Sequence, residues 1–165
     1  MKRMVIFDMD GTLCDVRAAR PLVDPSVPVG TVVDVHGVEF TKRTVKDFDA
    51  FHLSSEFCPP YDWVVEEAQK SHQMGYVNGI LTGRMEQYRD LTSRYLKKYE
   101  TPFRWLLMRP QDDFRKDVEI KAEKLHLLKD AGYQFVRAFD DNPNIIALWE
   151  ENGIPVTVVP GWIGS

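Results

Sequence analysis

Two aspartates, Asp8 and Asp10, end a short apolar run close to the start of the chain. Residues 5–7 predict a buried strand, and the Gly-Thr pair after Asp10 predicts a turn that cannot continue it. The strand therefore carries both carboxylates to its C-terminal edge, where open α/β sheets bind their ligands. A carboxylate pair there can hold a hard cation through oxygen ligands. One of the two carboxylates can also attack phosphorus as a nucleophile.

Residues 8–13 read D-M-D-G-T-L, which resembles the first motif of the haloacid dehalogenase (HAD) superfamily of phosphohydrolases. The resemblance implies that Asp8 accepts the phosphoryl group and that Asp10 acts first as general acid and then as base. A calcium loop also begins D-x-D-G, but it continues with more oxygen ligands and a glutamate at the twelfth position. Here the chain continues T-L-C-D-V-R, and a strand precedes the motif where an EF-hand has a helix.

Residues 80–84, I-L-T-G-R, resemble the second motif of the superfamily, an apolar strand that closes in Ser or Thr. The hydroxyl of Thr82 and a backbone N–H beyond the turn are expected to bind a phosphate oxygen. Gly83 and Arg84 follow directly, and we expect both to contact the substrate.

The third motif of the superfamily supplies one lysine, whose ammonium offsets the like charges of nucleophile and phosphate. The candidates are Lys116 and Lys121. Asp117 and Lys121 are four residues apart and share one face of a predicted helix, so the carboxylate can orient the ammonium. We therefore choose Lys121, with Asp117 as its supporting residue.

The fourth motif is expected at Asp140-Asp141-Asn142. Two acids after an apolar run need partners if they are buried, and Asn142 already supplies a helix N-cap. With Asp8 and the backbone carbonyl of Asp10, one of the two completes an oxygen-rich Mg²⁺ site. Which acid touches the metal and which braces Lys121 stays open.

A narrower resemblance covers residues 107–121, which are similar to the phosphatase-domain family of bacteriophage polynucleotide kinase-phosphatase. That family removes 3′-phosphates from nucleic-acid ends and nucleotides. The resemblance implies a substrate role for Arg84 and essential roles for the residues that match its acids and base: Asp117, Lys121, Asp140 and Asp141. The arginine after the first motif matches Arg17 or Arg20, and Arg20 fits better. Arg109 is a further candidate for substrate binding.

Apolar spacing predicts alternating strands and helices from residue 59 to the C-terminal region. Helices are expected near 63–74, 88–99, 118–128 and 143–152, and strands near 76–82, 103–108, 135–139 and 155–159. This order predicts a Rossmann-like parallel sheet with helices on both faces. Residues 1–165 are expected to form one HAD-like domain, with residues 21–60 as a small cap or flap insertion that holds a hairpin near 31–40. Residues 42–53 have mixed spacing, which assigns no definite element to them.

A length of 165 residues suits one domain, and a formal net charge of −4 argues against broad adhesion to nucleic acid or anionic membrane. The two cysteines, Cys14 and Cys58, lack the spacing of a zinc site. No signal peptide or membrane span is evident, so a cytoplasmic protein is expected. No Walker-type loop occurs, so we expect no kinase half here and leave open whether a separate kinase or ligase is a partner.

These observations favour a Mg²⁺-dependent phosphomonoesterase that acts on a phosphorylated nucleotide or a nucleic-acid 3′-end. One alternative is a mononucleotide phosphatase of the 5′(3′)-deoxyribonucleotidase type. Another class, a phosphate-binding or phospho-accepting regulator without turnover, has no need of a second aspartate. Asp10 distinguishes an enzyme from such a regulator, because turnover requires an acid and base. Aromatic residues such as Phe51, Tyr61 and Trp63 offer rings for base stacking, although such residues more often form the core.

Overall fold

A five-stranded sheet forms the centre of the protein, and all of its neighbouring strands are parallel. The computed structural model describes residues 2–162, so the ends of the predicted domain, residues 1 and 163–165, lie outside the described residues. The predicted parallel α/β fold is confirmed. In spatial order the strands are β5 (Trp105–Arg109), β4 (Val77–Met85), β1 (Lys2–Phe7), β6 (Tyr133–Asp140) and β7 (Val156–Val158).

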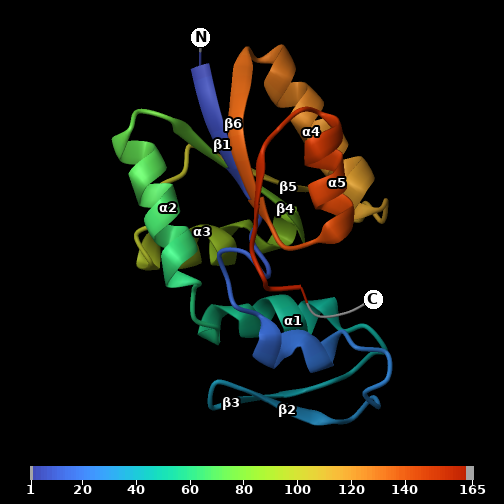
Figure 1. Ribbon diagram of the computed structural model, residues 1–165. Helices are drawn as coiled ribbons and strands as arrows, with labels where there is room; N and C mark the ends of the chain where they lie inside the picture. The colour runs from blue at the N-terminus through green and yellow to red at the C-terminus, as the bar shows by residue number, and fades with distance from the viewer. Residues whose placement is uncertain (1, 163–165) are drawn as a thin grey trace.

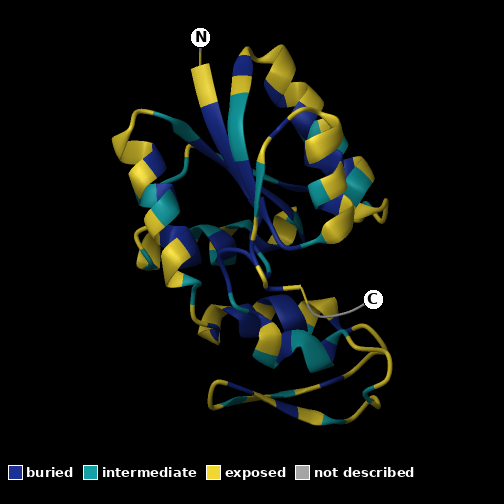
Figure 2. Cartoon of the chain, viewed as in Figure 1, coloured by how far each residue is buried: buried dark blue, intermediate teal, exposed yellow. Residues whose placement is uncertain are grey.

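Strand β1 is apolar on both faces, because Met4 and Ile6 belong to one core cluster and Val5 and Phe7 to the other. Successive side chains of a strand point to opposite faces, so both faces of this sheet need a cover of helices. Helices α4 and α5 pack on the face of Ile6, and α2 and α3 cover the opposite face (Figure 1). The central strands β1 and β4 are accordingly buried along most of their length (Figure 2). The bounds are α2 (Asp62–Gln73), α3 (Arg89–Lys98), α4 (Asp117–Asp130) and α5 (Pro143–Glu151).

The order of the strands fixes where a ligand can bind. After β1 the chain builds β4 and β5 on one side and then β6 and β7 on the other. The direction of winding therefore reverses beside β1, and open α/β sheets bind ligands in the crevice at the carboxyl end of such a switch point. Asp8 and Asp10 follow β1 at that end.

A smaller lobe lies beyond this edge, built from the segment between β1 and α2 (Figure 1). It holds the predicted hairpin, which is confirmed, and a helix in the stretch to which mixed spacing assigned no definite element. The buried amine of Lys42 donates to the carbonyl oxygens of Asp24 and Val27, which anchors the hairpin to the preceding loop. The elements are η1 (Arg17–Leu22), β2 (Val32–Val35), β3 (Val38–Thr41), α1 (Phe48–Ser54) and η2 (Ser55–Phe57).

The other predicted elements lie close to their expected positions. Helix α5 has Asn142 as its N-cap and Pro143 at its first position, as expected. Strand β4 runs on to Met85, three residues past its predicted end, because Met85 pairs with Arg109 of β5 after a break in register. Among residues 2–162, the helices are all too short or too polar to cross a membrane.

Candidate active site

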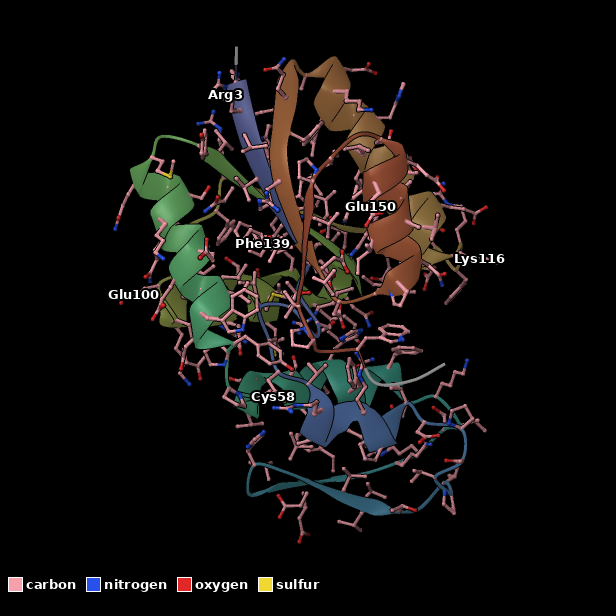
Figure 3. The ribbon with its side chains drawn as sticks, viewed as in Figure 1. Arg3, Cys58, Glu100, Lys116, Phe139 and Glu150 are labelled. Atoms are coloured by element: carbon pink, nitrogen blue, oxygen red, sulfur yellow. The ribbon has the colours of Figure 1, made fainter. Side chains whose placement is uncertain are left out.

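The three sheet strands at the switch point bring their terminal polar residues together. Phe7 of β1 is in register with Ile80 of β4 and with Phe139 of β6, and Phe139 lies near the middle of the view in Figure 3. The register therefore continues to Asp140 beside Asp8 on one side, and on the other side β4 passes Leu81 and brings Thr82 to the same cavity. A cavity of about 610 Å³ opens here between the sheet edge and the smaller lobe, and all the predicted site residues except Asp140 line it.

Lys121 lies between two carboxylates at the floor of the site. Its Nζ donates to Asp8 Oδ1 at 2.8 Å and to Asp140 Oδ2 at 3.4 Å. Burial alone would lower the pKa of Lys121, but the negative charges of Asp140 and Asp8 raise it above its ordinary value. The ammonium is therefore charged at neutral pH. Lys116, the other candidate, is exposed at the N-cap of α4 (Figure 3).

Asp140 and Asp141 have different surroundings. Asp140 Oδ1 accepts the backbone N–H groups of Asp141 and Asn142 at 2.9 and 3.1 Å. Its Oδ2 accepts from Trp149 at 3.3 Å as well as from Lys121. Asp141 Oδ1 accepts only from the Thr12 hydroxyl, at 3.3 Å, and its buried Oδ2 has no hydrogen-bond partner.

The three acids Asp8, Asp140 and Asp141 fit a hard divalent cation. Each offers one carboxylate oxygen, and these oxygens lie within 4.8 Å of one another. Burial and the charge of Asp8 raise the pKa of Asp140 to about 6 and that of Asp141 to about 9. An all-oxygen donor set with one unpartnered buried oxygen suits Mg²⁺. Gly11 packs tightly against this cluster of acids: its φ is +82°, and a Cβ there would lie 2.0 Å from Asp141 Oδ2.

Asp10 is held by Arg84, whose side chain is buried. Arg84 Nη2 donates to Asp10 Oδ1 at 2.5 Å and Nε donates to Oδ2 at 3.1 Å, a bidentate pair. Its Nη1 donates to Thr92 at 3.0 Å. Burial raises the pKa of Asp10, but the guanidinium outweighs burial and lowers it to about 2. The sequence predicted a substrate contact for Arg84, whereas its guanidinium is engaged inside the protein because Asp10 lies within reach.

Comparison with known proteins identifies the family. A family model described as the polynucleotide kinase PNKP phosphatase domain matches residues 28–161. The chain belongs to this family. Members of it are phosphatases of the HAD superfamily, so this chain is a HAD-type phosphatase domain. No curated protein sequence gives a significant match.

Solved structures agree with the family. The chain in a Pnkp1/Rnl/Hen1 complex is 27% identical with a TM-score of 0.69, over 96% of this chain and 46% of that one. A chain in a Pnkp1/Rnl/Hen1 RNA repair complex is 25% identical with a TM-score of 0.68, over 96% of this chain and 42% of that one. This PNKP-type phosphatase domain thus spans less than half of those chains. A putative phosphatase from Clostridium difficile, 17% identical with a TM-score of 0.64 over 99% and 87%, shares the fold.

Arg109 and Asp117 are partners of each other in this PNKP-type domain. Arg109 donates to Asp117, to the Gly83 carbonyl at 2.9 Å, and to the carbonyls of Asp113 and Arg115. The predicted contact between Asp117 and Lys121 is therefore wrong. The helix places Asp117 and Lys121 on one face, but the Asp117 carboxylate accepts from the guanidinium of Arg109. Lys121 donates to Asp8 instead. Arg109 likewise fastens the loop after β5 to β4 where a substrate contact was expected.

Arg20 is the arginine best placed to meet an anion. Its guanidinium lies over the rings of Phe51 and Trp162, with 5.6 and 5.7 Å to their centroids. Its Nη2 is 3.9 Å from Asp141 Oδ2, and its buried Nε has no partner. Arg17, the alternative from the sequence, instead forms a surface pair with Asp15 at 2.7 Å.

The cavity also contains residues that the sequence analysis missed. His52 of α1 lies 3.8 Å from Asp10. Phe48 and Phe114 also line the cavity, and these two residues are 52% and 82% exposed. An aromatic residue between charged neighbours, as in D-D-F-R-K at 112–116, was the available signal for Phe114. Of the three aromatic residues considered from the sequence, Phe51 is a buried cavity wall, and Tyr61 and Trp63 are absent from its lining.

Proposed function

We propose that this phosphatase is a Mg²⁺-dependent phosphomonoesterase that removes 3′-phosphate from polynucleotide ends through a phosphorylated Asp8. The observation that carries the proposal is the position of Asp8. It lies in the cavity with Lys121 at 2.8 Å, and the Arg84-bound Asp10 lines the same cavity. A nucleophile, a cation and a separate acid are the groups that phosphoryl transfer through an aspartate requires.

The reaction proceeds in two steps. In the first, the negative charge of the bound phosphate group opposes the effect of Arg84 and favours the protonated form of Asp10. An oxygen of Asp8 then forms a bond to phosphorus while the bond to the ester oxygen breaks, and Asp10 gives its proton to that oxygen. In the second, water attacks the phosphorus of the acyl phosphate, Asp10 takes the proton of the water, and Asp8 and inorganic phosphate are released. In both steps the negative charge of the phosphoryl oxygens is stabilised by Lys121, Thr82 and Arg20.

Asp8, Asp141 and the backbone carbonyl of Asp10 would hold Mg²⁺, and Asp140 would brace Lys121. The unpartnered oxygen of Asp141 supports this division, because both oxygens of Asp140 already accept hydrogen bonds. When bound, the ion offsets the negative charge of the phosphoryl group.

Magnesium is expected to raise the melting temperature of the protein. The raised pKa values of Asp140 and Asp141 report repulsion among the buried acids, which a divalent cation relieves. Calorimetry with 10 mM Mg²⁺ against EDTA should give an increase of about 3 °C. Asp141→Asn should remove most of the increase, and the exposed Asp130→Asn should retain it. An equal increase in both variants would contradict the assignment of Asp141.

The rim of the cavity supports a nucleotide as substrate. Phe48 comes from the smaller lobe and Phe114 from the loop after β5, and both are largely exposed. Lys46 lines the same rim, and Arg115 lies there paired with Asp113 and Glu123. Exposed aromatic rings beside basic side chains are the usual means of binding single-stranded nucleic acid. The similar Pnkp1 chains, one of them in a complex named for RNA repair, support polynucleotide ends and a separate repair partner.

A substrate panel tests the proposed specificity. Oligonucleotides with a 3′-phosphate should have a higher kcat/KM than 5′-phosphorylated oligonucleotides or mononucleotides, in both RNA and DNA series. A preference for mononucleotides would overturn the assignment to polynucleotide ends and favour a deoxyribonucleotidase-type phosphatase. Phosphoryl uptake without turnover of any substrate would favour a regulator.

Loss of the Phe114 ring should weaken binding of the terminal base. Phe114→Ser is expected to raise KM for a 3′-phosphorylated oligonucleotide about 10-fold, since stacking contributes roughly 1–3 kcal/mol per base. An oligonucleotide whose 3′-terminal residue is abasic should show a much smaller change. Phe57→Ser is the matched control, because Phe57 is exposed but does not line the cavity. An equal rise with the abasic substrate would exclude stacking on Phe114.

A further inference from the structure

His52 is a buried residue of the smaller lobe that faces the proposed acid of the core. It is 7% exposed, and its Nδ1 lies 3.8 Å from Asp10 Oδ2. Nδ1 is buried without a hydrogen-bond partner. Among residues 2–162, a buried side-chain nitrogen or oxygen without a hydrogen-bond partner occurs in Arg20, His52 and Asp141, and all three residues line the cavity. A buried nitrogen without a hydrogen-bond partner lowers the stability of the folded protein. Its position facing Asp10 therefore indicates a functional role.

The ring of His52 is held in place by its neighbours. It packs against the rings of Tyr88 and Phe51, with centroid distances of 4.8 and 5.2 Å. The hydroxyl of Tyr88 donates to Asp49 Oδ1 at 2.6 Å, which fastens α1 to the core beside His52. These contacts hold the imidazole beside Asp10.

The groups that act on His52 electrostatically are Asp10, Arg84 and Asp49. Burial lowers the pKa of His52 to about 4, so the ring is neutral under physiological conditions. A neutral imidazole carries one N–H. With the proton on Nδ1, His52 can donate to the carboxylate oxygen that faces it.

We propose that His52 is a positioning residue, which donates from Nδ1 to Asp10 Oδ2 and fixes the plane of the Asp10 carboxyl group toward the leaving oxygen. The proposal rests on the proposed function, in which Asp10 is the acid. An N–H···O hydrogen bond requires an approach of about 1 Å from the present distance. Arg84 holds Asp10 from the core and His52 would hold it from the smaller lobe. The acid is therefore fully oriented only when the smaller lobe has moved toward the core.

Two substrates of nearly the same shape separate this role from a structural one. Phenyl phosphate and p-nitrophenyl phosphate differ in their leaving groups, and phenol is the weaker acid. Departure of phenolate therefore depends more on proton donation by Asp10. The readout is kcat/KM, which covers the steps up to release of the leaving group.

Three variants complete the test. His52→Leu should lower kcat/KM for phenyl phosphate about 10-fold more than for p-nitrophenyl phosphate, because small misplacements of a catalytic group reduce rates strongly. His52→Asn keeps an N–H donor close to the position of Nδ1 and should restore most of the loss. Leu53→Ala changes an exposed residue of the same helix and should leave the ratio of the two substrates at the wild-type value.

Equal losses with both substrates, or no rescue by His52→Asn, would overturn the positioning role and leave His52 a packing residue. No loss in His52→Leu would overturn it as well. Neither substrate contains a nucleotide, so a failure of the 3′-end assignment leaves this test intact. Absence of all phosphatase activity in the wild-type protein would instead refute the proposed function itself.

Discussion

Asp8→Asn is expected to lower kcat by about 10⁴-fold or more, the loss typical for removal of a nucleophile. The amide has nearly the shape of the carboxylate, and its one oxygen can still accept from Thr12 or from Lys121, which now donate to different oxygens of Asp8. It cannot form an acyl phosphate. Turnover of p-nitrophenyl phosphate in Mg²⁺ gives the rate, and circular dichroism with thermal melting reports the fold.

Asp15→Asn is the matched control for this substitution. Asp15 follows the first motif, but its carboxylate pairs with Arg17 and does not line the cavity. We expect nearly wild-type turnover in this variant. If Asp8→Asn kept a rate close to that of Asp15→Asn, Asp8 would not be the nucleophile.

Asp10→Asn has the second largest expected effect, a loss of about 10²–10³-fold in kcat. An amide neither delivers a proton to the leaving oxygen nor takes one from water. It also leaves the buried guanidinium of Arg84 without its anionic partner. With p-nitrophenyl phosphate, whose leaving group departs unprotonated, the first step should survive better than the second, and phosphorylated protein should accumulate.

A rapid-quench experiment measures this accumulation against the wild-type protein. If the Asp10→Asn variant turned over at the wild-type rate, the role of Asp10 in proton transfer would be contradicted. A uniform loss of both steps, with no accumulation, would indicate that Asp10 only holds Arg84 and the surrounding loop in place.

The sequence was sufficient to predict the sheet and the edge at which the polar residues gather. The apolar run at residues 5–7 and the mostly apolar stretch at 135–139 predict strands, and in a parallel sheet the carboxyl ends of such strands meet at one edge. The spacing of Asp117 and Lys121 selected Lys121 over Lys116, although the contact behind that choice does not form. Lys121 is instead buried beside Asp8 and Asp140, whereas Lys116 caps the helix in solvent.

The partners of the arginines could not be predicted in the same way. Spacing along one helix placed Asp117 beside Lys121, but Arg109 arrives from a different strand and takes that carboxylate. Arg84 similarly meets Asp10 across 74 residues of sequence. Such pairs depend on how strands and loops pack together. No local pattern contains that information.

The contribution of the smaller lobe was hidden for a related reason. Residues 42–53 lack regular apolar spacing, because α1 is short and packs both on its own lobe and over the active site. His52 and Phe48 sit on this helix, and residue type alone did not distinguish them from core residues. The exposed surface of Phe48 and the unpartnered nitrogen of His52 become visible only in the folded chain.

The most direct test of the account is the identity of the phosphorylated residue. Wild-type and Asp10→Asn protein should be mixed with p-nitrophenyl phosphate and Mg²⁺, quenched in acid within one turnover and analysed by peptide mass spectrometry. The account predicts a phosphoryl group on Asp8, with a larger occupancy in Asp10→Asn. A phosphoryl group on another residue, or turnover by the wild-type protein with no phosphorylated intermediate in either sample, would contradict it.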